Sequence, residues 1–321
     1  MSSVRTAESS RPLIAVSSCL LGQQVRYDGG HKRDDWIAGP LSGHVDFRPI
    51  CPEVAIGLGI PRPPIHLTGD PLRPRAVGVQ DPGLDVTAPL EHFAGQTARG
   101  LDDVSGYILK SRSPSCGMAR VRLHGQHGGH RTAAGIHARV IMARLPNLPV
   151  EEEGRLNDPV LRENFINRVY AYRRWQDFRR QRLTAKGLVA FHAGHKYLVM
   201  AHSQAAYGRI GRLLSDLKGV QLAEVAQQYI DELMTALQRR VGRERHVNVL
   251  QHIMGHLKRR LEGDDKQELL AAVEAYRRGE VPLIVPLFLL RHHLRHHPDA
   301  YLAGQWYLHP YPDALGLRNN I

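Results

Sequence analysis

The sequence predicts an α/β domain, Rossmann-like with a mainly parallel sheet, followed by an all-α domain. In the first half, short apolar runs rich in strand-forming residues end in turns that contain Gly or Pro, a pattern typical of buried strands in such a sheet. In the second half, apolar residues recur at helical spacing. A length of 321 residues is sufficient for two hydrophobic cores.

The expected organisation is a disordered tail over residues 1–11, an α/β domain over 12–160, a connecting helix over 161–183 and a helical domain over 184–321. The first residues, MSSVRTAESS, contain no apolar signal segment. The run VPLIVPLFLL is too short to span a bilayer, and an odd number of cysteines argues against a disulfide framework. We therefore expect a cytoplasmic protein without membrane contact.

Three predicted strands each end in a turn that carries a cysteine. They are residues 13–16 before Cys19 in SSCLLG, residues 45–50 before Cys51 in ICPEV, and residues 106–110 before Cys116 in SPSCGM. In open α/β sheets, ligands bind at the carboxyl ends of the strands. We therefore expect the three sulfurs to meet along one edge of a parallel sheet.

The remaining elements follow from the same signals. We expect a strand at residues 75–80, helices over 36–41, 88–103 and 133–144, and loops up to Pro64 and over 145–159. A long helix is expected from the N-cap Asp158 to Arg182. Further helices are expected over residues 184–200, 204–215, 221–237, 245–261, 264–278 and 282–296, before an extended tail that contains several prolines.

The net charge of +12 is unevenly distributed. Residues 1–160 carry 18 Lys or Arg and 16 Asp or Glu, whereas residues 161–321 carry 25 and 15, a net charge of +10. Such asymmetry indicates a polyanionic partner, usually a nucleic acid. The alternative is a basic helical domain that has no such partner.

The three cysteines allow three interpretations. In the first, they are small buried apolar residues. In the second, they are zinc ligands that need a further ligand such as His. In the third, they are ligands of an iron–sulfur cluster with one open iron. Their positions in Gly/Pro turns at strand ends favour a metal centre. Glu53, two residues after Cys51, could activate water beside such a centre, or it could simply be a carboxylate at a helix N-terminus.

Three separated blocks, CLLGQQVRYDGGHK, CPEVAIGLGIPRPP and ILKSRSPSCG, resemble the thiouracil desulfidases and lie in order across about residues 13–145. In the second half, KGLVAFHAGHKYLVMAHS, HVNVLQHIMGHLKRRL and YRRGEVPLIVPLFLLRHHLRHHPDAYLAGQ resemble a helical domain of unknown function. Chains with both parts resemble two-domain desulfidases that remove sulfur from 4-thiouridine in tRNA.

The resemblance implies a [4Fe–4S] cluster on Cys19, Cys51 and Cys116, with the unligated iron open to the substrate's sulfur. Water would replace sulfur at the pyrimidine carbon without net electron transfer. Glu53 would assist water attack or proton transfer, and Ser113 would position the substrate. Some family members have a functional serine in the loop after the first cysteine, but residues 23–35 contain none here, so that role is not transferred.

Further contacts are expected around these groups. Substrate-binding residues are Arg26, Tyr27, Asp28, Gly29, Lys110 and Ser115. Candidate tRNA contacts are Arg179, Arg180, Arg182, Arg239, Arg240, Lys258, Arg259 and Arg260, and Arg173 and Arg174 lie on the same basic helix as the first three. For His292, His293, His296 and His297 we prefer an RNA-facing or capping role over metal binding.

We therefore expect a tRNA 4-thiouridine desulfidase, monomeric or weakly dimeric. One alternative is a desulfidase of free thiouracil or thionucleotides, with the helical domain serving dimerisation. The other is a non-catalytic nucleic-acid-binding or cluster-sensing protein.

Overall fold

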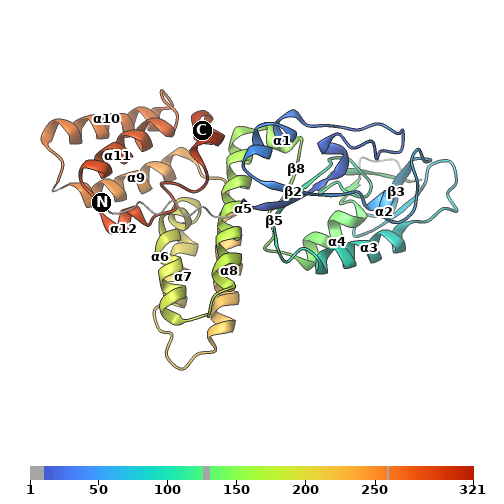
Figure 1. Cartoon of the computed structure of the whole chain (residues 1–321), viewed down its shortest axis with the longest axis horizontal. Coiled ribbons are helices and arrows are strands. Elements are labelled where there is room, and N and C mark those ends of the chain that lie inside the picture. The colour runs from blue at the N-terminus through green and yellow to red at the C-terminus, as the bar shows by residue number, and fades with distance from the viewer. Residues whose placement is uncertain (1–10, 126–130, 259) are drawn as a thin grey trace. The chain divides into compact units, whose positions relative to one another are not determined.

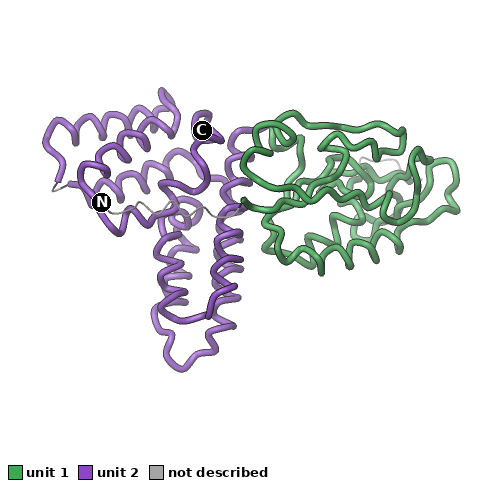
Figure 2. The backbone as a smooth tube through the Cα atoms, in the orientation of Figure 1, with its two compact units in different colours: residues 1–157 green, residues 158–321 purple. Residues whose placement is uncertain are grey.

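The computed structural model describes residues 11–125, 131–258 and 260–321. The chain divides into two compact units, residues 1–157 and 158–321 (Figure 2). The first combines sheets with helices and the second is helical, which confirms the predicted α/β plus all-α fold class. Of the tail predicted at residues 1–11, all but Arg11 lies outside the described residues. The predicted boundaries at residues 160 and 183 stay predictions.

The main sheet of the first unit is parallel, with the strand order β2-β1-β5-β8. Its strands are β1 (Leu13–Ser17), β2 (Asp46–Ile50), β5 (Val104–Leu109) and β8 (Val150–Glu152). The central strands β1 and β5 are almost entirely buried, as continuous apolar runs in a parallel sheet require. The three strands predicted to carry the cysteines are therefore direct neighbours.

A second sheet has the order β4-β3-β6-β7. It comprises β3 (Ile65–Asp70), β4 (Arg73–Gly78), β6 (Val121–His124) and β7 (Thr132–Ala133). Its apolar side chains share a core with α3 (Thr87–Arg99) and α4 (Ile136–Arg144), which lie side by side (Figure 1). The predicted strand at residues 75–80 belongs to this sheet, where β4 pairs antiparallel with β3, a strand that the sequence analysis did not predict.

Two segments predicted as loops contain regular structure. In the proline-rich stretch, α2 (Pro52–Ala55) begins with a proline, which is tolerated at the first helical position because no N–H is needed there. In the segment 145–159, β8 pairs with β5. The other short helices of this unit are η1 (Ser18–Leu21), α1 (Asp35–Ala38), η2 (Pro40–Gly43) and η3 (Arg155–Asn157).

The second unit is built from helices around a large apolar core. These are α5 (Pro159–Arg179), α6 (Ala185–His202), α7 (Gln204–Leu213), α8 (Leu222–Leu237), α9 (Arg243–Leu257), α10 (Gly263–Arg278), α11 (Ile284–His296) and α12 (Ala300–Ala303), then η4 (Asp313–Leu315) and η5 (Leu317–Asn320). The side chains of Asp158, Thr184 and Ser203 cap α5, α6 and α7 by accepting backbone N–H bonds. None of the helices in the described ranges has the length and apolar character to cross a bilayer.

Candidate iron–sulfur site

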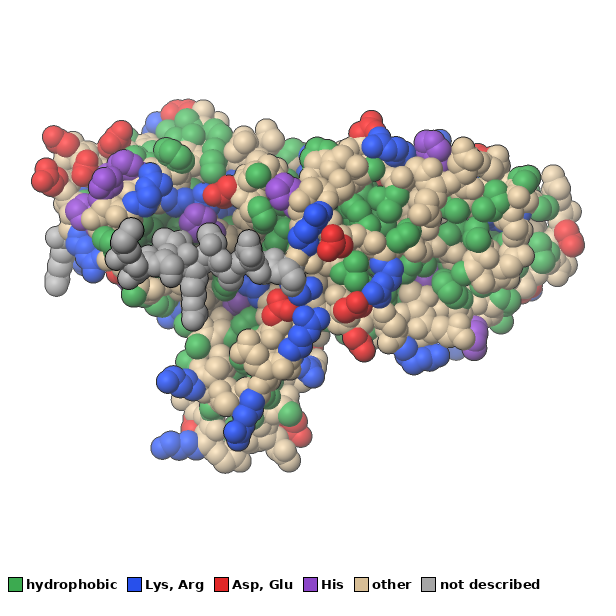
Figure 3. Space-filling view, viewed as in Figure 1, with side chains coloured by type: hydrophobic (Ala, Val, Ile, Leu, Met, Phe, Trp, Pro, Cys, Tyr) green, Lys and Arg blue, Asp and Glu red, His purple; other side chains and the backbone are tan. Residues whose placement is uncertain are grey.

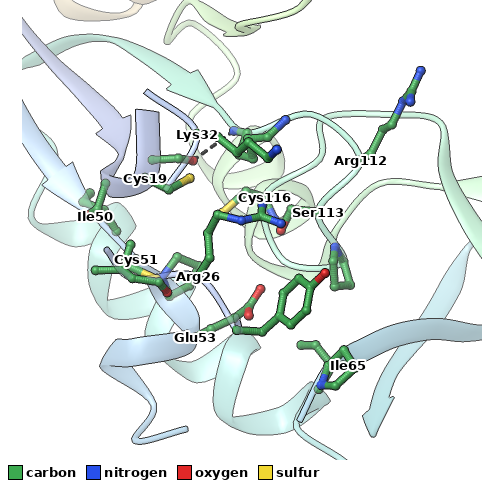
Figure 4. Close-up of a pocket in the computed structure, with 18 of the residues that line it drawn as sticks. Cys19, Arg26, Lys32, Ile50, Cys51, Glu53, Ile65, Arg112, Ser113 and Cys116 are labelled. Carbon is green, nitrogen blue, oxygen red and sulfur yellow. Dashed lines mark hydrogen bonds between the residues drawn. The ribbon is translucent and has the colours of Figure 1, made fainter. Parts of the chain in front are cut away.

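A pocket of about 460 Å³ lies at the carboxyl edge of the main sheet, and all three cysteines line it (Figure 4). The register of the sheet brings them together. Ser17 pairs with Ile50 and Val16 pairs with Ile108, so β2, β1 and β5 end at a common edge. The predicted convergence of Cys19, Cys51 and Cys116 on one pocket therefore follows from three adjacent parallel strands.

The three thiols are unpaired and largely withdrawn from water. Burial raises the pKa of Cys19 to about 11, and the nearby charge of Cys51 adds to the effect. Burial also raises the pKa of Cys51, and it raises that of Cys116 most strongly. Without a positive centre the thiols are protonated, whereas a bound metal would hold them as thiolates.

Glu53 projects from α2 into this pocket and is held from two sides (Figure 4). Its Oε2 accepts hydrogen bonds from Nε and Nη2 of Arg62 at 3.1 and 2.8 Å. Its Oε1 accepts a bond from the hydroxyl of Ser115 at 2.9 Å. Only 4% of the Arg62 side chain and 13% of the Glu53 side chain are exposed, so this ion pair is poorly screened by solvent. The carboxylate is thus fixed in orientation beside the thiols.

The turn that carries Cys116 is built around Ser113. Oγ of Ser113 accepts the backbone N–H bonds of Ser115 and Cys116 at 3.2 and 3.1 Å. The hydroxyl therefore has its own proton left to donate toward the pocket that it lines. The turn also packs closely against the start of α4, since a Cβ on Gly135 would lie 2.7 Å from the backbone carbonyl of Ser115.

Two carboxylates at the end of β8 hold the same loop. Glu152 accepts the backbone N–H of Met118 at 2.7 Å. Glu153 accepts the backbone N–H and the hydroxyl of Ser111, both at 2.7 Å, and pairs with the ammonium of Lys110. The predicted substrate-binding residue Lys110 lines the pocket, but its charge is already paired with Glu153.

The other predicted substrate-binding residues divide into two groups. Arg26 and Tyr27 line the pocket, and Figure 4 shows Arg26 reaching across it toward Ser113. Asp28 and Gly29 are not among the lining residues. Asp28 instead accepts the backbone N–H of Gly30, which is the first cause of its lowered pKa. Ser115 is fully buried behind Glu53.

Sequence reasoning assigned no site role to Arg62, Arg112 or Glu153. Arg62 lies between prolines in CPEVAIGLGIPRPP, where a charged residue normally indicates an exposed loop. Arg112 lines the pocket and adopts a positive φ of 58°, a rare backbone conformation for a residue with a side chain. The acidic run around Glu153 gave no signal of its pairing with Lys110.

The predicted tRNA contacts lie in the second unit. All of them that are described are exposed, namely Arg179, Arg180, Arg182, Arg239, Arg240, Lys258 and Arg260, whereas Arg259 lies outside the described residues. On the face shown in Figure 3, Lys and Arg are spread over this unit among Asp and Glu and do not form one patch. Arg180 pairs with Asp177 at 2.8 Å.

Arg173 and Arg174, by contrast, face the interior. Arg173 is buried and pairs with Asp177 at 3.0 Å. The guanidinium of Arg174 lies over the ring of Trp306 at 4.3 Å and donates to the carbonyl of Pro310. These two arginines stabilise the second unit and are unsuited to bind RNA.

In the histidine tract, His293 is buried, and the rings of His292 and His296 are 4.8 Å apart. Neither here nor elsewhere in the described residues are three His, Cys, Asp or Glu side chains arranged to hold a single metal ion. Three cysteines lining one pocket are the number of protein ligands that a cluster with one open iron needs, because each cysteine would bind a different iron.

A parallel sheet that delivers three cysteines and a fixed carboxylate into one pocket defines an α/β protein with a cysteine-lined pocket at the carboxyl edge of its sheet. Residues 14–153 match the family model described as 2-thiouracil desulfurase. Residues 196–312 match a second family model, described as a protein of unknown function (DUF1722). Two uncharacterized relatives are YbgA of Escherichia coli (strain K12) and YbbK of Bacillus subtilis (strain 168). YbgA is 31% identical and the match covers 49% of this chain and 94% of YbgA, whereas YbbK is 33% identical with coverages of 46% and 99%.

A solved structure described as the [4Fe-4S]-dependent thiouracil desulfidase TudS is 32% identical and aligns with 48% of this chain and 98% of that one. Its TM-score of 0.36 is too low to identify a fold by itself. From the family model and the relatives together, the chain belongs through residues 14–153 to the 2-thiouracil desulfurase family, and its second half carries the DUF1722 region.

Proposed function

We propose that this protein is a [4Fe–4S]-dependent desulfidase that replaces the sulfur of a thiolated pyrimidine with oxygen from water and releases sulfide. The observation that carries the proposal is the single pocket that contains Cys19, Cys51, Cys116 and Glu53. Three thiolates satisfy three irons of such a cluster and leave the fourth open. When bound, the cluster supplies a soft Lewis acid that suits a thiocarbonyl sulfur.

The protein's own groups supply the rest of the chemistry. Glu53, held by Arg62 and Ser115, is an oriented acceptor for a proton of the attacking water. The hydroxyl of Ser113 is in place to donate a hydrogen bond to the pyrimidine. The thiocarbonyl and one water yield a carbonyl and hydrogen sulfide, so no external electron donor is required.

For the substrate, we propose 4-thiouridine within tRNA. Two observations support a substrate that carries phosphate. Arg26, Lys32 and Arg112 line the pocket, and among the described residues no ion pair engages Lys32 or Arg112. The second half of the chain adds a net charge of +10. Both features favour a polyanion over a neutral base.

Free thiouracil is the second candidate, and the description of the matching family favours it. The pocket of about 460 Å³ would hold the cluster as well as the substrate, so its volume does not distinguish a base from a single nucleotide. A free base would offer no anionic group to Lys32 and Arg112.

The test is an anaerobic assay on the reconstituted full chain. Iron and sulfide should each approach about four per chain, as expected for a [4Fe–4S] cluster. Thiolated tRNA and free 2-thiouracil are then treated in parallel, and loss of thione absorbance is followed together with sulfide release. Turnover of the free base with tRNA untouched would reject the tRNA substrate, and protein that stays free of iron would reject the desulfidase itself.

Cys51→Ala is the matched variant for the cluster. We expect it to lose iron and all desulfidation, since two thiolates cannot retain the cluster. Full activity in this variant would show that Cys51 is not a ligand.

A further inference from the structure

The second unit contains a pocket of its own, of about 370 Å³, formed by α6, α7, α9 and α12. Its lining includes Lys196, Tyr197, Met200, Tyr207, His256 and Tyr301. Neither the charge pattern nor the histidine tract pointed to this place. Its walls are mainly aromatic rings, which is unusual for a surface hollow on a basic unit.

The rings form a connected set. The Tyr197 hydroxyl and His256 Nε2 are 3.1 Å apart, so one hydrogen bond joins them. The His256 ring stacks on that of Tyr301, with centroids 5.4 Å apart and planes 20° from parallel. Tyr301 is 37% exposed and therefore offers ring surface to a ligand. Packing on His256 holds this ring in one orientation.

The electrostatic character of the pocket selects the ligand. No carboxylate lines it, which disfavours a metal ion or an ammonium group. Lys196 lies over the ring of Tyr207 at 5.6 Å and supplies a cation at the wall. Burial raises the pKa values of Tyr197 and Tyr301, and the carboxylate of Asp299 is close enough to add to this effect. It accepts the backbone N–H of Tyr301 as the N-cap of α12, and it lies 3.7 Å from Arg260. A planar ring joined to an anion fits these walls.

We propose that this pocket binds one nucleotide of a single-stranded RNA segment, with the base against Tyr301 and its phosphate at Lys196. Aromatic side chains that stack with bases, next to cations that bind the backbone, are the physical means of single-strand recognition. The inference rests on the proposed function, because a tRNA substrate requires such contacts outside the catalytic pocket. Lys258, the C-cap residue of α9, is a further exposed cation at the end of the helix that carries His256.

The test measures binding of the full chain to a fluorescently labelled single-stranded oligouridine over a range of salt concentrations. Tyr301→Ala should weaken binding about tenfold or more without changing the salt dependence, since it removes stacking and no charge. Tyr301→Phe should bind like the parent. Lys196→Gln should lower the slope of log affinity against log salt by about 0.7, the contribution of one phosphate of a single strand.

Phe288→Ala is the matched control, because Phe288 is a 63% exposed aromatic residue of the same unit that does not line this pocket. It should leave binding unchanged. A fully paired RNA duplex should be insensitive to Tyr301→Ala, because its bases are not free to stack. Competition by uridine monophosphate that depends on Tyr301 would place a free nucleotide in the pocket as well.

The inference is overturned if Tyr301→Ala stays within about twofold of the parent, or if it weakens duplex and single strand equally. Desulfidation of thiolated tRNA and of free 2-thiouracil by the parent protein is measured in parallel to separate the two proposals. Normal desulfidation with Tyr301-independent RNA binding would refute the nucleotide pocket alone. Tyr301-dependent binding by a protein that desulfurates nothing would refute the proposed function alone.

Discussion

Arg62 places two nitrogens on one carboxylate oxygen of Glu53, at 3.1 and 2.8 Å. The same guanidinium donates to the carbonyl of Gly59 at 2.9 Å, and the backbone N–H of Arg62 donates to the carbonyl of Tyr27. The arginine therefore ties the carboxylate to the loop that follows the first cysteine. Because the pair is buried, either partner left alone would be a costly uncompensated charge.

We expect Arg62→Gln to retain the cluster and to lower the desulfidation rate about 10- to 100-fold, since Glu53 loses its orientation. The measurement is iron content together with kcat. Glu53→Gln in the same background is the control. If Arg62→Gln lowers kcat by the same factor in the Glu53→Gln variant as in the parent protein, Arg62 does not act through the carboxylate.

The cations at the pocket predict a substrate-dependent defect. Replacing both Lys32 and Arg112 with Gln should lower kcat/KM for a phosphate-bearing thiolated substrate about 10- to 100-fold, the usual loss of charge-assisted bonds. The kcat/KM for free 2-thiouracil should not change. Arg73→Gln, an exposed change on β4 outside the pocket, is the control. Equal losses on both substrates would contradict a role in phosphate binding.

The contact between α4 and the cysteine turn predicts a steric defect. Gly135→Ala would place a Cβ 2.7 Å from the Ser115 carbonyl and 2.9 Å from that of Pro114. We expect a destabilisation of about 1–3 kcal/mol, together with reduced iron content, because the backbone that carries Cys116 must move. Thermal unfolding and iron analysis measure both. Gly43→Ala, with nothing within 4 Å of its Cβ, should be neutral, and a neutral Gly135→Ala would contradict the packing.

Buried histidines make the stability of the second unit depend on pH. Burial lowers the pKa of His202 to about 4, and its two nitrogens lie 2.6 Å from the Arg239 carbonyl and 3.4 Å from Nδ2 of Asn167. In the unfolded chain, His202 binds a proton below its ordinary pKa of 6.5. In the folded chain, His202 stays neutral until the pH falls to about 4. The contribution to stability is therefore complete above pH 6.5 and is lost as pH falls toward 4, by about 3 kcal/mol in all.

Denaturant unfolding followed by circular dichroism at pH 7 and pH 5 measures this loss. His202→Gln should reduce the difference between the two pH values, since Gln does not titrate. The exposed His252→Gln is the control and should leave the difference as it is. An unchanged difference in His202→Gln would assign the pH dependence to other groups.

The strands that carry the cysteines could be predicted because their signal is local. A short apolar run before a Gly/Pro turn indicates a buried strand, and adjacency in the sheet then places the turns together. The helices of the second half could be predicted for the same reason. Arg173 and Arg174 show the limit of such reasoning, because helical spacing does not reveal which arginines the fold encloses.

The missed features depend on partners distant in sequence. The sequence VEE becomes β8 only because β5 offers an edge, and Glu152 and the next residue, Glu153, accept the backbone N–H groups of Met118 and Ser111. Arg62 is buried because Glu53 neutralises it, a pairing that proline and charge content conceal. The second sheet requires β3 to pair with β4 and with β6, which lies far along the chain.

The adjacency of β2, β1 and β5 also constrains how the protein matures. Cys19 and Cys116 come from distant parts of the chain, so their sulfurs meet only after the non-local pairing of β1 with β5. Such long-range pairings form late and slowly during folding. A nascent chain that ends before Cys116 cannot bring the three cysteines together, and the cluster that we propose would stabilise the completed sheet by mass action once bound. Under the proposed function, iron retention would therefore report folding quality as well as catalytic competence.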